Sequence, residues 1–149
     1  MTWPLAELLP HAGDMILLDS IDSWDEDSIV ALARVAGDRL FALPDGSWPV
    51  WLGIELMAQA VAAYAGLRAK SSGEQVQLGF LLGTRKFDCN VTHFPAGYLL
   101  RIRASRSLED DNGMGVFECR IDADDIEVRA RLNVFRPPRV DSFIQEVAP

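Results

Sequence analysis

The feature that most constrains this chain is residues 50–70, which read as a helix with apolar side chains on nearly every side. Alanines recur through it, and no run of β-branched residues opposes a helix. Its large apolar side chains are Val50, Trp51, Leu52, Ile54, Leu56, Met57, Val61, Tyr64 and Leu67. A helix that is hydrophobic all round is a buried helix. The sequence S-S-G at 71–73 predicts where it ends.

Short segments with the character of β-strands lie on both sides of this helix. They are residues 15–21 and 29–35 before it, and 76–82, 84–91, 98–108, 115–123 and 126–135 after it. Breaks are predicted at Gly83, at the turns 94–97 and 110–113, and at Asp124-Asp125. A short helix is expected at 4–9, an acidic turn at 22–27 and a loop at 40–49. One helix among antiparallel strands predicts an α+β layer arrangement.

Length and charge narrow the class of protein. The 149 residues fit a single domain over 1–138, followed by a loosely held tail at 139–149. The net charge of −8 argues against nucleic-acid binding. No apolar run reaches the roughly 18 residues of a membrane span, and no signal peptide opens the chain, so we expect a cytoplasmic protein. Cys89 and Cys119 lack metal-ligand spacing, and we expect both to be buried, with no metal bound.

Two polar side chains, Glu55 and Gln59, interrupt the apolar helix, and their i,i+4 spacing places them on one face. Burial disfavours the charged form of an unpaired carboxylate. A neutral carboxylic acid can donate a proton, so Glu55 is a candidate general acid. The structural alternative is that Gln59 and a backbone amide satisfy Glu55 without any chemistry.

The start of the helix is a second candidate site. Its first backbone N–H groups lack helical partners and suit a carbonyl oxygen that gains negative charge, such as that of a thioester. The structural alternative is a helix end capped by the preceding loop through Ser47.

The segment W-L-G-I-E-L-M-A-Q-A at 51–60 resembles the E-x-M-A-Q-A helix of the FabZ-like 3-hydroxyacyl-ACP dehydratases. The opening L-L-P-H at 8–11, followed by M-I-L-L-D at 15–19, is similar to the beginning of that family. R-K-F at 85–87 and F-P-A-G at 94–97 match a strand and its P-G turn. Within the family, G-I-E-x-M-A-Q-A and G-F-L-L-G at 79–83 are most similar to the branch from aryl polyene clusters, the ApeP-like proteins.

The resemblance implies a hotdog fold, a long helix wrapped by a curved antiparallel sheet, and dimers with the acyl site between subunits. It implies that Glu55 protonates the leaving 3-hydroxyl, while the backbone at Val50 and Trp51 polarises the thioester carbonyl. We assign substrate binding to these two residues and to Gln59, Leu82 and Gly83. No cofactor is expected beyond the phosphopantetheine of an acyl carrier protein or of coenzyme A, which carries the substrate.

The family's catalytic histidine, in a G-H-F-P motif, is missing. An ungapped count back from Glu55 puts Phe41 in its place, and phenylalanine cannot accept a proton. His93 spells H-F-P with its neighbours but lies in a later turn, which favours an exposed turn residue. His11 matches a family position in the N-terminal segment and stays a candidate catalytic group. Asp45 is a further candidate, although it reads more simply as a turn residue.

The basic residues Arg68, Lys70, Arg85 and Lys86 are candidates for contact with an acidic carrier protein or a phosphate; the alternative is a solvated charged surface. Three functions remain open. The chain is a dehydratase, or a dehydratase subunit that receives its histidine from a paralogous hotdog partner; or it is an acyl-thioesterase that uses Glu55 or Asp45; or it is a non-catalytic acyl-binding subunit. A homodimer or heterodimer is expected, paired through residues 76–82.

Overall fold

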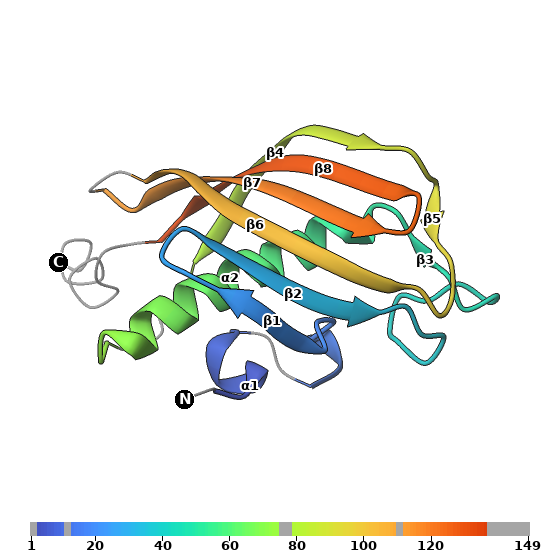
Figure 1. Ribbon diagram of the computed structural model, residues 1–149, viewed down its shortest axis with the longest axis horizontal. Helices are drawn as coiled ribbons and strands as arrows, with labels where there is room; N and C mark the ends of the chain where they lie inside the picture. Colours follow the sequence, from blue (N-terminus) through green and yellow to red (C-terminus); the bar gives the residue numbers. More distant parts are fainter. Residues whose placement is uncertain (1–2, 11–12, 75–78, 110–111, 137–149) are drawn as a thin grey trace, which may run out of the picture.

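The computed structural model describes residues 3–10, 13–74, 79–109 and 112–136. Their dominant feature is a long helix, α2 (Leu52–Ser71), held in the curve of a six-stranded antiparallel sheet (Figure 1). The strand order is β1 (Ser20–Trp24), β2 (Ser28–Arg34), β6 (Leu99–Glu109), β7 (Met114–Ala123), β8 (Ile126–Phe135) and β4 (Phe80–Cys89). This arrangement confirms the predicted α+β hotdog fold.

Three small elements complete the described chain. The short helix α1 (Leu5–Leu8) packs against α2, and a 3-10 turn (Gly13–Met15) follows it. The strands β3 (Trp48–Pro49) and β5 (His93–Phe94) pair with each other just before α2 begins. The pairing ties the start of the helix to the connection between β4 and β6.

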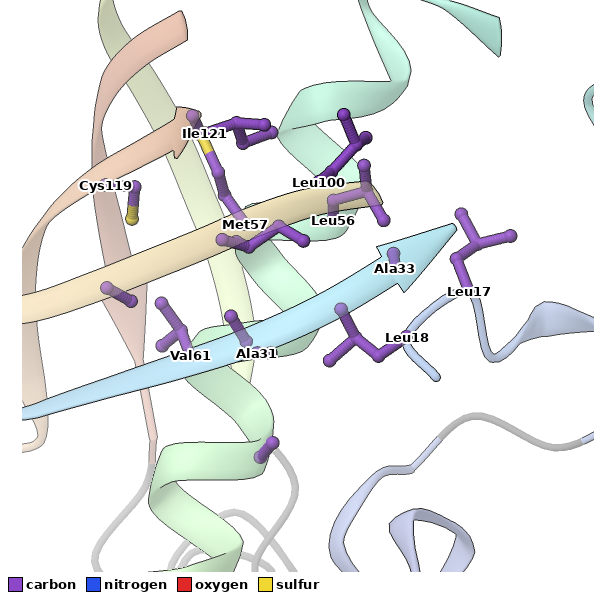
Figure 2. Packing of buried hydrophobic residues seen from close by; sticks show 14 of the residues in the cluster. Leu17, Leu18, Ala31, Ala33, Leu56, Met57, Val61, Leu100, Cys119 and Ile121 are labelled. Atoms are coloured by element: carbon purple, nitrogen blue, oxygen red, sulfur yellow. The ribbon is translucent and has the colours of Figure 1, made fainter. Parts of the chain in front are cut away.

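One hydrophobic core joins the helix to the sheet. Alternate residues of β7 and β8 point inward and are buried, as expected for a sheet with one covered face. Figure 2 shows Leu56, Met57 and Val61 of the helix facing the strands that carry Leu100 and Ile121. Twelve residues of α2 are buried, and the face with Ile54, Glu55, Ala58, Ala62 and Ala65 is half-buried. The helix is therefore buried, as its composition predicts.

Two predicted strand boundaries are wrong. The apolar segment expected as a strand at 15–21 begins at the end of the 3-10 turn, and sheet pairing begins only at Ser20. Leu17 and Leu18 are consecutive and both buried, so they lack the alternation of a strand with one covered face. The break expected at Gly83 is absent, since β4 runs through it from Phe80 to Cys89 with an irregular register beside the glycine. Glycine here marks a bulge, which bends a strand without ending it.

The predicted dimer edge and the predicted tail both include residues outside the described ranges. Strand β4 lies at one edge of the sheet, and residues 76–78 of the predicted pairing region 76–82 lie outside the described residues. The predicted tail at 139–149 also lies outside them. The turn expected at 22–27 is shorter than predicted, because Asp22 already belongs to β1.

Candidate active site

A cavity of about 240 Å³ lies between α2, the end of α1 and one end of the sheet. The helix contributes a wall of small side chains between Glu55 and Arg68, and the sheet contributes the neighbouring ends of β4, β7 and β8. The residues that line it are Leu8, Pro10, Glu55, Ala58, Val61, Ala62, Tyr64, Ala65, Arg68, Gly79, Leu81, Gly113, Gly115, Phe117, Val134, Phe135 and Arg136. A mostly apolar hollow with a few polar groups is the usual form of a small-molecule site.

Glu55 is the one carboxylate in the lining of this cavity within the described part of the chain. It stands in the first turn of α2 and is partly buried. The side-chain amide of Gln59, one turn further along the helix, donates a hydrogen bond of 3.0 Å to Glu55 Oε1. The predicted pair is therefore in contact, and Glu55 faces a mostly apolar cavity.

Gln59 lies behind this wall and is fully buried. Its Oε1 accepts a hydrogen bond of 2.9 Å from the backbone N–H of Leu17, and its Nε2 donates one of 2.7 Å to the carbonyl of Met15. Burial of an amide is costly unless its hydrogen bonds are made, and here they are. The prediction that Gln59 binds substrate stays a prediction; the structure gives it protein partners on both sides.

The start of α2 is built differently from the capped alternative. Its N-cap residue, Trp51, makes no side-chain cap, and the predicted cap Ser47 instead donates its hydroxyl to Asp45 Oδ1 at 2.6 Å. The backbone N–H of Val50 donates to the carbonyl of Thr92, across the β3–β5 pair. The Ser47 cap is thus wrong. The roles predicted for Val50 and Trp51 stay predictions, because neither residue lines the cavity described above.

Asp45 is held in a turn. It accepts hydrogen bonds from the hydroxyl and the backbone N–H of Ser47, at 2.6 and 3.0 Å. These bonds lower the pKa of Asp45, the hydroxyl contributing most. A carboxylate that is fixed in this way, and that does not line the Glu55 cavity, is a poor general base for chemistry there.

Neither Phe41, which occupies the position of the missing histidine, nor the described histidine, His93, lines this cavity. Phe41 packs edge-on against the exposed Trp51 ring, with centroids 5.9 Å apart, at the start of the helix. His93 is exposed and sits in strand β5 opposite Pro49, so its assignment to a turn is wrong while its exposure is confirmed. His11 lies outside the described residues. Its neighbour Pro10 lines the cavity.

The four basic residues do not form one patch. Arg68 lines the cavity, and its guanidinium lies over the Tyr64 ring, 5.6 Å from the centroid, a cation–π contact. Lys70 is in the last turn of α2, whereas Arg85 and Lys86 are exposed on β4, where Lys86 has a positive φ beside a register shift. Their contact with a carrier protein stays a prediction.

The sequence alone missed part of the lining. Leu81 lines the cavity, while its predicted neighbours Leu82 and Gly83 do not, and the side chain of Leu82 is 56% exposed. Arg136 also lines it, directly after β8, and its only sequence signal is a basic residue that ends an apolar strand. Two guanidinium groups therefore share the cavity with one carboxylate.

The two cysteines have different environments. Cys119 is buried, as predicted, and burial raises the pKa of its thiol to about 12. Cys89 is exposed on β4, so its predicted burial is wrong. Over the described ranges, no group of three metal-binding side chains comes together. In the same ranges, no helix is both long and apolar enough to span a bilayer.

Comparisons with solved structures agree with the fold. A chain of the dehydratase heterocomplex ApeI:P from Xenorhabdus doucetiae is 31% identical, with a TM-score of 0.87, and the match covers 100% of both chains. The Escherichia coli PaaI protein from the phenylacetic acid degradation operon is 18% identical, with a TM-score of 0.59, over 78% of this chain and 82% of that one. A hypothetical thioesterase with coenzyme A from Streptococcus pneumoniae TIGR4 is 13% identical, with a TM-score of 0.60, over 78% and 86%.

These last two likenesses show the fold alone. The comparison with curated proteins gave no match. The comparison with protein families matched residues 3–145, nearly the whole chain, to the family described as ApeP dehydratase. The chain belongs to the ApeP-like dehydratase family.

Proposed function

We propose that this chain is the acid-bearing subunit of a dehydratase for 3-hydroxyacyl thioesters, and that a histidine from a second hotdog subunit removes the proton at C2. The observation that carries the proposal is Glu55, the carboxyl group of a mostly apolar cavity whose described lining contains two arginines and no histidine. Dehydration needs a base at C2 and an acid at the 3-hydroxyl. The chain offers the acid at this cavity.

The position of Phe41 supports a base supplied by a partner. Phe41 occupies the sequence position of the family's histidine, yet it packs on Trp51 and does not line the Glu55 cavity. A histidine at this position of the same chain would therefore lie outside that cavity. The related chain from Xenorhabdus doucetiae belongs to a dehydratase heterocomplex, ApeI:P, and this supports a second, different subunit as the source of the base.

We place the acyl chain in the part of the Glu55 cavity that runs along α2. Ala58, Ala62 and Ala65 present small side chains on one face, between Glu55 and Arg68. Thirteen residues at about 1.5 Å each give a path of roughly 20 Å. An acyl chain placed there would have its C3 hydroxyl at Glu55 and its apolar part over the alanines. We assign carriage of the thioester to acyl carrier protein or coenzyme A in the cytoplasm, and assembly to the β4 edge of the sheet.

The test is dehydration of a 3-hydroxyacyl thioester by this chain alone, by a histidine-bearing hotdog partner alone, and by their mixture. General-base help is worth about 10²–10⁴ in rate, so the chain alone should be slower than the mixture by that order. Glu55→Gln keeps the size of the side chain and an oxygen that accepts from Gln59, but removes the acid. It should slow the mixture while leaving the free energy of unfolding nearly unchanged.

A matched control is Glu118→Gln, the same chemical change on the exposed face of β7, where Glu118 pairs with Arg131. It should leave the rate unchanged. Full activity of the chain alone, or a mixture that is indifferent to Glu55→Gln, contradicts the proposal. Release of free thiol from an acyl-CoA by the pure chain would favour the thioesterase instead, and binding without turnover would favour a non-catalytic subunit.

A further inference from the structure

The buried amide of Gln59 has an orientation that its surroundings determine. The backbone N–H of Leu17 can only donate, so the atom 2.9 Å from it is the amide oxygen. The carbonyl of Met15 can only accept, so the atom 2.7 Å from it is the amide nitrogen. A flipped amide would put two donors together and two acceptors together. The nitrogen of Gln59 must therefore face Glu55.

This orientation distinguishes the two oxygens of Glu55. Gln59 Nε2 has two hydrogens, one directed to Met15 and the other to Glu55 Oε1, 3.0 Å away. An acidic proton on Oε1 would point against that N–H. In the neutral acid, Oε1 is thus the carbonyl oxygen and the hydroxyl oxygen is Oε2.

We propose that Gln59 is a positioning residue, which holds Glu55 Oε1 as an acceptor and so makes Oε2 the oxygen that delivers the proton. The inference rests on the proposed dehydratase function. In the step concerned, the partner's base takes the C2 proton, the C2–H electron pair forms the C2=C3 bond, and the C3–O bond breaks. The hydroxyl leaves as water with the proton from Oε2. Solvent later takes the C2 proton from the base and returns a proton to the carboxylate, so both groups are restored.

The same amide ties the acid to the N-terminal segment. Met15 and Leu17 lie 44 and 42 residues before Gln59, and Leu17 is fully buried. The segment therefore sets the orientation of the amide, and the amide sets that of the carboxyl group. A residue with this role changes the chemical step without touching substrate, because Gln59 lies behind the cavity wall.

The experiment compares two substrates on the complex with the histidine-bearing partner: a 3-hydroxyacyl thioester and its 3-fluoroacyl analogue. Hydroxide needs a proton to leave, whereas fluoride leaves with far less help. Gln59→Met fills the same space and removes the donor. It should lower kcat for the hydroxyl substrate about tenfold or more, change the fluoride rate little and leave KM unchanged. The ratio of the two rates on one preparation does not depend on how much of the protein is folded.

Two further variants keep the test decisive. Gln59→Leu also removes the donor, with a second apolar side chain of similar size, so it should change the ratio in the same direction. Asn90→Leu is the matched control, because Asn90 also joins two backbone groups, the Asp125 carbonyl and the Glu127 N–H, away from the cavity. It should leave the ratio unchanged.

An equal fall with both substrates would show that Gln59 is only structural and would overturn the inference. An unchanged ratio in both Gln59 variants would do the same. If the wild-type complex eliminates neither water nor fluoride, the proposed function itself fails. If it eliminates both and the ratio ignores Gln59, only the positioning role fails.

Discussion

Gly66 faces α1 so closely that a methyl group has no room there. A Cβ atom built on Gly66 would lie 2.6 Å from the carbonyl oxygen of Leu8 and 3.1 Å from its Cα. The nearest atoms belong to backbone, so they cannot move aside by a rotamer change. Gly66→Ala must therefore displace either α1 or α2, the helix that contains Gly66.

The magnitude follows from two opposing effects. Alanine favours a helix over glycine by about 0.5–1 kcal/mol. Against this gain stands one of two costs. Either the overpacking persists, which costs about 1–3 kcal/mol, or α1 shifts and exposes the fully buried Leu8, which costs about 1.5–3 kcal/mol. The net loss should be about 0.5–2.5 kcal/mol, which lowers Tm by roughly 1–10 °C for a chain of this size.

The assay is urea unfolding followed by tryptophan fluorescence, with all variants at one protein concentration because association would add stability. Gly53→Ala in the same helix is the control. Its Cβ would meet Ile121 Cδ1 at 3.3 Å, the end of a flexible side chain that can shift. That variant should match or slightly exceed the wild-type stability.

A Gly66→Ala protein as stable as Gly53→Ala would refute the reasoning. It would mean that α1 is held loosely enough to move without loss. Because Leu8 and Pro10 line the cavity, such a result would also remove α1 as a fixed wall of the site.

Two other measurements check the local chemistry. Cys89 should react at once with a thiol reagent and Cys119 only on unfolding, because Cys119 is buried and its pKa is raised to about 12. Mass spectrometry that finds both thiols labelled in the native protein would refute this. The pKa of Asp25 is lowered, chiefly by the backbone N–H groups of Asp27 and Ser28. The ionised Asp25 therefore stabilises the folded protein above the unfolded pKa of about 3.9, and this contribution is lost as the pH falls through the lower pKa of the folded state. Asp25→Ala should therefore reduce the urea midpoint at pH 7 and have a smaller effect near pH 3, and a constant difference would count against the assignment.

The sequence by itself determined most of the helix and strand segments and the burial of the long helix. Those properties depend on neighbouring residues, and the alanine-rich helix and the alternating strands β7 and β8 carry them locally. It also singled out Glu55 and Gln59, because two polar groups on one face of an apolar helix stand out without any knowledge of the fold. The same local reasoning failed at Gly83, because a glycine within an apolar segment is typical both of a bulge inside a strand and of a break between two strands.

Tertiary structure alone decided what surrounds the acid. The partners of Gln59 lie 42 and 44 residues away, and Arg136 reaches the cavity from the far end of the chain. Such contacts depend on how the N-terminal segment crosses the helix and where the ends of β4, β7 and β8 meet, and periodicity carries no information about either. The burial of Cys119 and the exposure of Cys89 differ for the same reason: both lie in strands, but one faces the helix, and only the packed sheet determines which.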